Sequence, residues 1–216
     1  MRWRNRSGSQ GGATGYQQHF EDAPRSKVYR VIERFSEDLD VSITYIQQAV
    51  KIEMGSRSDH WPVELKTLTS IVSEQMPKAI ASHEVSVRVL TAKRTFWEKA
   101  TILHMYAHLP ESKPVPKRQS RHYYDFYRLL GSPFKAEALG ELSLLDRVAE
   151  HKGIYFRAAW AKYELAKKGS LRLMPEEGVL KEMQRDYDAM REMFFGQVSD
   201  WDEIVESIKS FEKDFN

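Results

Sequence analysis

Apolar residues in the middle of the chain repeat first with the period of a strand and then with the period of a helix. Residues 85–90, VSVRVL, place valine at every second position, which predicts a short strand. Thr91 follows and is the expected N-cap of a helix, because its hydroxyl can accept a hydrogen bond from an otherwise unpaired backbone N–H. The apolar residues of that helix recur every three or four positions: Phe96, Ala100, Leu103 and Ala107.

The helical period continues beyond Gly131, where we expect four helices. Their predicted ranges are 136–151, 154–168, 175–195 and 200–211, and glycines follow the first three. The residues expected in the core of this part are Trp160, Tyr163, Leu165, Leu180, Met183, Tyr187, Met190 and Phe194. A helical C-terminal half is therefore predicted.

The N-terminal part has shorter elements and carries acidic residues on its predicted strands. Residues 26–35 have a helical pattern, whereas 36–45 and 49–55 alternate like strands. Asp38 and Asp40 lie at i and i+2 on the first strand, so both carboxylates point to one face, about 7 Å apart. Such a pair can bind a hard cation such as Mg²⁺ or form a solvated face. Glu53 on the second strand is either a third carboxylate of that cluster or an exposed residue beside Lys51.

Composition narrows the class of protein. The chain of 216 residues is 41% hydrophobic and has no cysteine, which excludes disulfides and thiolate chemistry and fits a cytoplasmic protein. No apolar run is long enough to span a bilayer, so we expect no membrane partner. Residues 88–128 hold nine Lys/Arg against three Asp/Glu, whereas residues 174–216 hold five against twelve. This asymmetry predicts a basic face for polyanions and an acidic end that repels them or docks a basic partner.

Lys99 and Asp125 are the main candidates for chemistry. Lys99 lies beside the apolar face of the helix after Thr91, and Asp125 falls in a second predicted helix, SRHYYDFYRLL. We expect the two side chains on facing elements. An amine and a carboxylate there indicate either a site for an anionic ligand or a single structural ion pair.

Two further groups of residues invite a functional interpretation. The loop between these helices carries Lys113, Lys117, Arg118 and Arg121, which could contact RNA phosphates. His104 and His108 have the i, i+4 spacing of a metal site, but no carboxylate stands at a useful spacing, so we assign them no metal.

The segments RTFWEKATILHMYAH and SRHYYDFYRLL resemble the AbiEii/AbiGii nucleotidyltransferase toxin family, within the DNA polymerase β-type superfamily. VIERFSEDLDVSI and AVKIEMGSRSDHWPVE resemble the same family in the same order, so the resemblance spans about residues 26–130. It implies an α+β fold, in which a small nucleotidyltransferase-like mixed sheet precedes a C-terminal helical bundle. The expected organisation is a disordered or atypical arm (1–25), a shortened nucleotidyltransferase-like region (26–90) and a helical domain (91–216).

The resemblance also implies an activity. The protein would be the toxin of a bacterial toxin–antitoxin or abortive-infection system used in phage defence, transferring a nucleoside monophosphate from an NTP to RNA, such as tRNA. Its implied partners are the NTP, the RNA and a cognate antitoxin protein. Asp38, Asp40 and Glu53 would bind Mg²⁺ or Mn²⁺, and Ser26, Lys27 and Lys99 would bind the nucleotide. Lys99 and Asp125 would be the catalytic residues, Asp125 either orienting Lys99 or acting as the base.

The sequence departs from the family pattern at two places. Glu21–Arg25 replaces a glycine-rich phosphate-binding turn; Pro24 lacks an N–H donor, and the acidic residues repel a triphosphate. The stretch between the Asp strand and the Glu strand is also several tens of residues shorter. These departures favour an alternative, a catalytically inactive remnant that binds an antitoxin or RNA. A third alternative is a helical scaffold in which Lys99 and Asp125 are purely structural.

Overall fold

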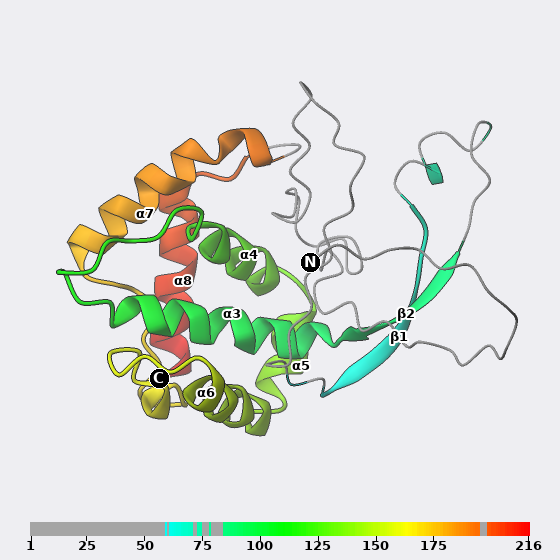
Figure 1. Ribbon diagram of the computed structural model, residues 1–216, viewed down its shortest axis with the longest axis horizontal. Coiled ribbons are helices and arrows are strands. Elements are labelled where there is room, and N and C mark those ends of the chain that lie inside the picture. Colours follow the sequence, from blue (N-terminus) through cyan, green and yellow to red (C-terminus); the bar gives the residue numbers. More distant parts are fainter. Residues whose placement is uncertain (1–58, 60, 71–72, 75–77, 79–83, 195–197) are drawn as a thin grey trace, which may run out of the picture.

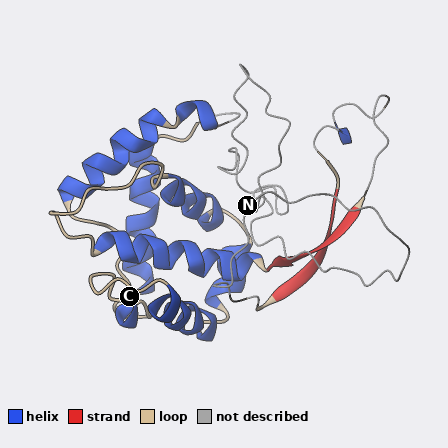
Figure 2. Ribbon diagram, in the orientation of Figure 1, coloured by secondary structure: helices blue, strands red, loops and turns tan. Residues whose placement is uncertain are grey.

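The computed structural model describes residues 59, 61–70, 73–74, 78, 84–194 and 198–216. The protein is α+β, with the helices toward its C-terminus, as predicted. Figure 2 shows two strands on one side and the helices on the other. The elements in chain order are β1 (Val63–Leu68), β2 (Val85–Leu90), α3 (Ala92–Ala107), α4 (Arg121–Leu130), α5 (Phe134–Leu139), α6 (Ser143–Tyr155), η1 (Tyr163–Leu165), α7 (Glu177–Ala189), η2 (Arg191–Met193) and α8 (Trp201–Phe215).

The two strands form an antiparallel ribbon that leads directly into α3 (Figure 1). The predicted strand 85–90 is confirmed, and its partner β1 arises in a segment with no clear pattern. Val63 pairs with Leu90 and Leu68 with Val85, so the ribbon is in register over its whole length. Thr91 ends β2 and is the N-cap of α3, but its hydroxyl makes no capping bond, and among the described residues its Oγ1 has no hydrogen-bond partner.

Helix α3 is the central element of the helical part. It packs against α4 on one side and against α5 and α6 on the other, while α8 packs against α4 (Figure 1). The predicted apolar residues of α3, from Phe96 to Ala107, are all buried. Burial of side chains from 3–4 spaced positions is what holds an amphipathic helix in place.

Aromatic side chains fill the centre between α3, α4 and α8. The ring of Phe96 lies 4.8 Å from that of Phe126 and 5.7 Å from that of Phe211, centroid to centroid. Trp97 is fully buried, and its indole N–H donates to the carbonyl oxygen of Ala138 at 3.1 Å. That hydrogen bond connects α5 to α3. The rings of Phe96, Phe126 and Phe211 meet in tilted and edge-on arrangements, which are favoured geometries for aromatic pairs.

The predicted helix 136–151 is wrong as a single element. The chain forms α5 up to Leu139 and starts α6 at Ser143, with Gly140 between them. The predicted helix 175–195 is shorter than expected, since α7 ends at Ala189 and a 3₁₀ turn follows. The last helix agrees with its prediction: Asp200 is the N-cap, accepting the N–H of Asp202 at 2.8 Å.

The predicted helix 154–168 is also wrong. Residues 156–176 form a largely irregular segment with a single 3₁₀ turn, in which Lys162 has φ of 48° and Gly169 has φ of 89°. Tyr163 is buried as predicted, whereas Leu165 is 38% exposed and does not belong to the core. Ala166, Leu171 and Leu173 of the segment are buried in the core, and Glu212 adds polar contacts by accepting the backbone N–H groups of residues 173 and 174.

Candidate active site

Lys99 and Asp125 meet where α3 faces α4. The ammonium nitrogen Nζ of Lys99 lies 2.8 Å from Oδ2 of Asp125. The lysine is 7% exposed and the aspartate is fully buried. The two residues therefore form one buried ion pair, which confirms that they lie on facing elements.

His122 is the third member of this cluster. It precedes Asp125 by three residues, so both side chains lie on the same face of α4. Its Nδ1 lies 3.1 Å from Nζ of Lys99. An ammonium group only donates, so this nitrogen accepts the hydrogen bond and the neutral ring carries its proton on Nε2. Two groups on α4 thus orient the Lys99 ammonium.

A second buried cation, Arg94, lies five residues earlier on α3. Its guanidinium donates to Asp59 at 2.9 Å, to Glu98 at 3.0 Å and to the carbonyl oxygen of Trp61. Arg147 of α6 binds the same Asp59 through two nitrogens and stacks over the Trp61 ring. These bonds join the segment that precedes β1 to α3 and α6.

The charge on Asp59 reflects these contacts. The hydrogen bond from Arg147 lowers the pKa of Asp59 most, and the bond and charge of Arg94 lower it further, against a desolvation penalty that raises it. The net result is a pKa far below the ordinary 3.8. Asp59 is therefore a permanent carboxylate at neutral pH.

The start of α4 is fixed by Asp186 of α7. The carboxylate of Asp186 accepts the backbone N–H of Arg118 at 2.6 Å, the N–H of Ser120 at 2.9 Å and the Ser120 hydroxyl at 2.6 Å. Ser120 directly precedes α4, which carries His122 and Asp125. Asp186 thus fixes the segment before α4 through main-chain N–H groups and a hydroxyl, whereas docking of a basic partner on the acidic end stays a prediction.

His104 serves the fold. Its Nε2 lies 3.0 Å from the carbonyl oxygen of Lys162, and its Nδ1 accepts the backbone N–H of Arg172 at 3.0 Å. Burial lowers the pKa of this fully buried imidazole, which favours the neutral ring that these bonds require. Across the part of the chain that the structure describes, no group of three His, Cys, Asp or Glu side chains could hold a metal ion.

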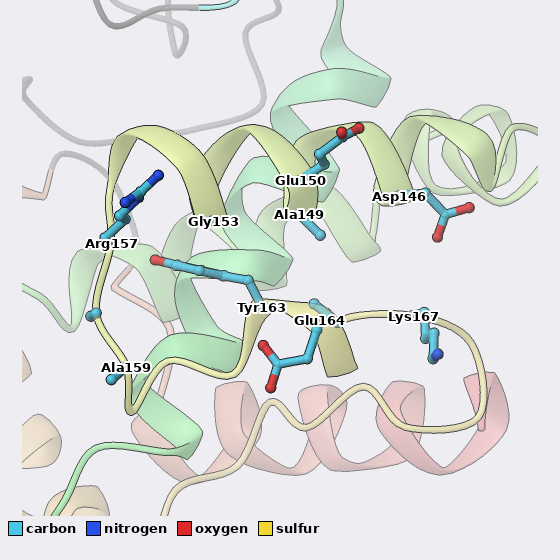
Figure 3. Close-up of a pocket in the computed structure, with 11 residues that line it drawn as sticks. Asp146, Ala149, Glu150, Gly153, Arg157, Ala159, Tyr163, Glu164 and Lys167 are labelled. Carbon is cyan, nitrogen blue, oxygen red and sulfur yellow. The ribbon is translucent and has the colours of Figure 1, made fainter.

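A groove of about 630 Å³ lies on the opposite side of α3, between α6 and the irregular segment. Figure 3 shows Tyr163 extending across it, with Arg157 and Lys167 toward its two ends. Asp146, Glu150 and Glu164 also line it, so it contains charges of both signs. None of the predicted site residues lines this groove, and we place no chemistry in it.

The remaining predicted site residues cannot be placed. Ser26, Lys27, Asp38, Asp40 and Glu53 all lie outside the described residues, so their proximity to Lys99 stays a prediction.

Residues 43–207 match the sequence model of one protein family. This family is the nucleotidyl transferase AbiEii toxin of type IV toxin–antitoxin systems. The chain belongs to the AbiEii toxin family. No curated protein and no solved structure matches the chain. The AbiEii match includes Glu53, Lys99 and Asp125, and it begins after Asp38 and Asp40.

The AbiEii family is described as one of nucleotidyltransferases. No helix among the described residues is long and apolar enough to cross a membrane. Sequence reasoning missed three residues that the geometry singles out: His122 as a partner of Lys99, Arg94 and Asp186. The i, i+3 spacing of His122 and Asp125 was the available signal for the first, and the i, i+4 spacing of Arg94 and Glu98 was a signal for the second. Asp59 and Ser120, the other partners of Arg94 and Asp186, are distant in sequence.

Proposed function

We propose that this AbiEii-family protein transfers a nucleoside monophosphate from an NTP to an RNA acceptor, with tRNA as the class to test first. The buried cluster of Lys99, Asp125 and His122 is the observation that carries the proposal. In the reaction a hydroxyl oxygen of the RNA bonds to the α-phosphorus, the bond to the β-phosphate oxygen breaks, and pyrophosphate leaves. The hydroxyl proton passes to a base or to solvent.

Lys99 is the residue that contacts the triphosphate. An ammonium held in a low-dielectric site stabilises charge that develops on phosphate oxygens more strongly than the same group does in water. Asp125 is completely buried and bonded to the lysine, so it acts as the positioning residue. This choice is preferred to a general base because a base must reach the acceptor hydroxyl itself.

Asp38, Asp40 and Glu53 are the proposed ligands of Mg²⁺ or Mn²⁺. Their donors are all carboxylate oxygens, which suit hard divalent cations, and the described residues offer no rival cluster. A divalent ion bound there would neutralise the triphosphate. Ser26 and Lys27 are proposed to contact the nucleotide as well.

The alternative is a catalytically inactive remnant that binds RNA or an antitoxin. The replacement of the glycine-rich turn by Glu21–Arg25 favours it, because this segment is poorly suited to hold phosphates. The two functions differ in one product: only the transferase forms RNA that carries an added nucleoside monophosphate.

A labelling experiment separates them. The purified protein is incubated with unfractionated tRNA, Mg²⁺ or Mn²⁺ and each NTP, carrying radioactive phosphorus at the α-position in one set and at the γ-position in another. Transfer of the monophosphate labels RNA from the α-position and leaves it unlabelled from the γ-position. Absence of label from every α-labelled NTP, with both metals, would select the remnant.

A further inference from the structure

The loop between α3 and α4 presents basic side chains on the surface. Lys113, Lys117 and Arg118 are exposed, and Pro114 and Pro116 separate the first two. Proline fixes φ and favours an extended backbone, so the lysines are kept apart and cannot fold back on each other. The loop therefore carries a row of positive charge.

The backbone of this loop is fastened to α7. Asp186 accepts the N–H groups of Arg118 and Ser120, and Glu182 accepts the N–H of Val115 at 3.3 Å. Gln119 adds a bond from the Tyr106 hydroxyl at 2.8 Å. Arg118 has φ of 63°, a strained value for a residue with a side chain, and the 2.6 Å bond to Asp186 holds it there.

These bonds determine where the acidic side chains of α7 point relative to the lysines of the loop. The carboxylates of Glu182 and Asp186 are directed at the main chain of the loop, while the lysine side chains lie exposed. Lys113 lies 5.8 Å from the centre of the Trp160 ring, which restricts its ammonium further. A cationic surface whose backbone is already ordered loses less entropy when it binds.

The C-terminal half of α3 connects the cluster around Lys99 to the loop, so an extended nucleic acid can reach both. From Lys99 to the end of α3 is eight residues, or about 12 Å at 1.5 Å per residue. That length corresponds to roughly three or four base-pair steps of a nucleic acid duplex.

We infer that the Asp186-anchored loop, residues 113–118, is the surface that binds the sugar–phosphate backbone of the RNA acceptor. The inference rests on the proposed transfer to RNA. The loop contributes affinity without reading the base sequence, because lysines that meet phosphates carry no sequence information. An acidic protein is the competing occupant of the same surface.

The first test compares two matched pairs of lysines. Binding of fluorescein-labelled unfractionated tRNA to the full chain is measured by anisotropy at several salt concentrations, for Lys113→Gln/Lys117→Gln and for Lys167→Gln/Lys168→Gln. The second pair is equally exposed and lies in the irregular segment. We expect the loop variant to bind roughly tenfold more weakly, with a salt slope smaller by about 1 to 2, and the control pair to bind like the native protein.

The second test uses one substitution for which electrostatics and loss of the anchor predict opposite changes in RNA affinity. Asp186→Asn removes a negative charge near the surface, so long-range electrostatics alone would strengthen RNA binding. Loss of the anchor predicts the opposite, a weaker complex. Melting curves followed by circular dichroism check that both loop variants are folded.

The results of these tests bear separately on the transfer reaction, on the RNA-binding surface and on the anchoring role of Asp186. If the native protein labels RNA and the loop variant binds tRNA like the native chain, the surface is elsewhere and the transfer stands. If Asp186→Asn binds as tightly as the native protein or more so, the anchoring role is wrong. If the native protein neither binds nor labels RNA, both proposals fail, and the loop becomes a surface for an acidic protein.

Discussion

Helix α3 buries two cations, and they are held in different ways. Arg94 is enclosed by Asp59, Glu98 and a carbonyl oxygen, so its planar group joins the segment before β1 to α3. Lys99 meets one carboxylate and one imidazole, both from α4. Arginine suits a fixed, multidentate junction, whereas lysine is a compact charge on a flexible stem.

The difference indicates that one helix can carry one buried cation that stabilises the fold and another that takes part in the reaction. The bonds of Arg94 connect the chain before β1 to the helical part, which is a structural task. Among the described residues, His122 and Asp125 of α4 contact the Lys99 ammonium and restrict its position. Loss of Arg94 should therefore affect folding first, and loss of Lys99 should affect the reaction first.

Lys99→Gln should show the largest effect, a decrease in the rate of transfer to RNA of about 100- to 1,000-fold. The physical reason is loss of the buried ammonium that, in our proposal, stabilises the charge developing on the triphosphate. Initial rates of labelling from the α-position measure it. Lys93→Gln is the control, because Lys93 lies on the same helix and pairs with Glu141 at 2.6 Å on the surface. An unchanged rate in Lys99→Gln would refute the role of Lys99.

The double variant Lys99→Met/Asp125→Leu tests whether the pair is purely structural. Replacing both members of a buried ion pair by apolar residues often leaves stability unchanged, whereas removal of one leaves a buried charge. We expect a melting temperature close to that of the native protein and no detectable transfer. A double variant that remains active would assign the pair to the fold alone.

Arg94→Met should destabilise the fold by about 3 to 5 kcal/mol, the usual cost of removing one partner from a buried ion pair. Arg94 is 1% exposed, and the change breaks its ion pairs with Asp59 and with Glu98. Urea unfolding gives the free energy of unfolding. The partial recovery expected in Arg94→Met/Glu98→Gln would show that the loss arises from the unpaired charge.

Asp59→Asn should change how the stability of the folded protein depends on pH. The pKa of Asp59 is lower in the folded protein than its ordinary 3.8, so its ion pairs contribute fully above that pH and are lost as the pH falls below it. Thermal unfolding from pH 7 to pH 3 should show a constant gap between native and variant near neutrality, narrowing in acid. A gap that is constant throughout would mean that the charge of Asp59 contributes nothing.

Arg147→Met should have the smallest effect of the series. This arginine binds Asp59 from the surface, where solvent screens its charge, and Arg94 continues to bind the same carboxylate. We expect a decrease in stability well below that of Arg94→Met in the same urea experiment. Equal losses in the two variants would show that the junction depends on both arginines together.

The sequence predicted that Lys99 and Asp125 lie on facing elements because two strong local patterns indicate it. The apolar residues of α3 define its buried face, and the aromatic residues around Asp125 define that of α4. The family and the α+β class followed from contiguous motifs. The catalytic roles of the pair, and those of Ser26, Lys27, Asp38, Asp40 and Glu53, stay predictions.

The errors occur where distant polar contacts override local pattern. Residues 156–168 have apolar residues at helical spacing, yet the backbone at Lys162 and Arg172 bonds to the ring of His104. Asp59 and Arg94 are 35 residues apart, and Ser120 and Asp186 are 66 apart. Such pairs have no periodic signature in one sequence, so only the structure reveals them.

Asp186 binds the loop before α4 mainly through main-chain N–H groups, which every residue except proline possesses. The shape of the loop therefore depends little on the side chain at Lys117, whereas Arg118, with φ of 63°, stands at a position that favours residues tolerant of a left-handed backbone. Mutations at Lys117 can alter how tightly a polyanion is held without moving the helix that carries Asp125. A library randomised at Lys117 would be expected to yield mostly folded proteins that differ in how tightly they bind RNA.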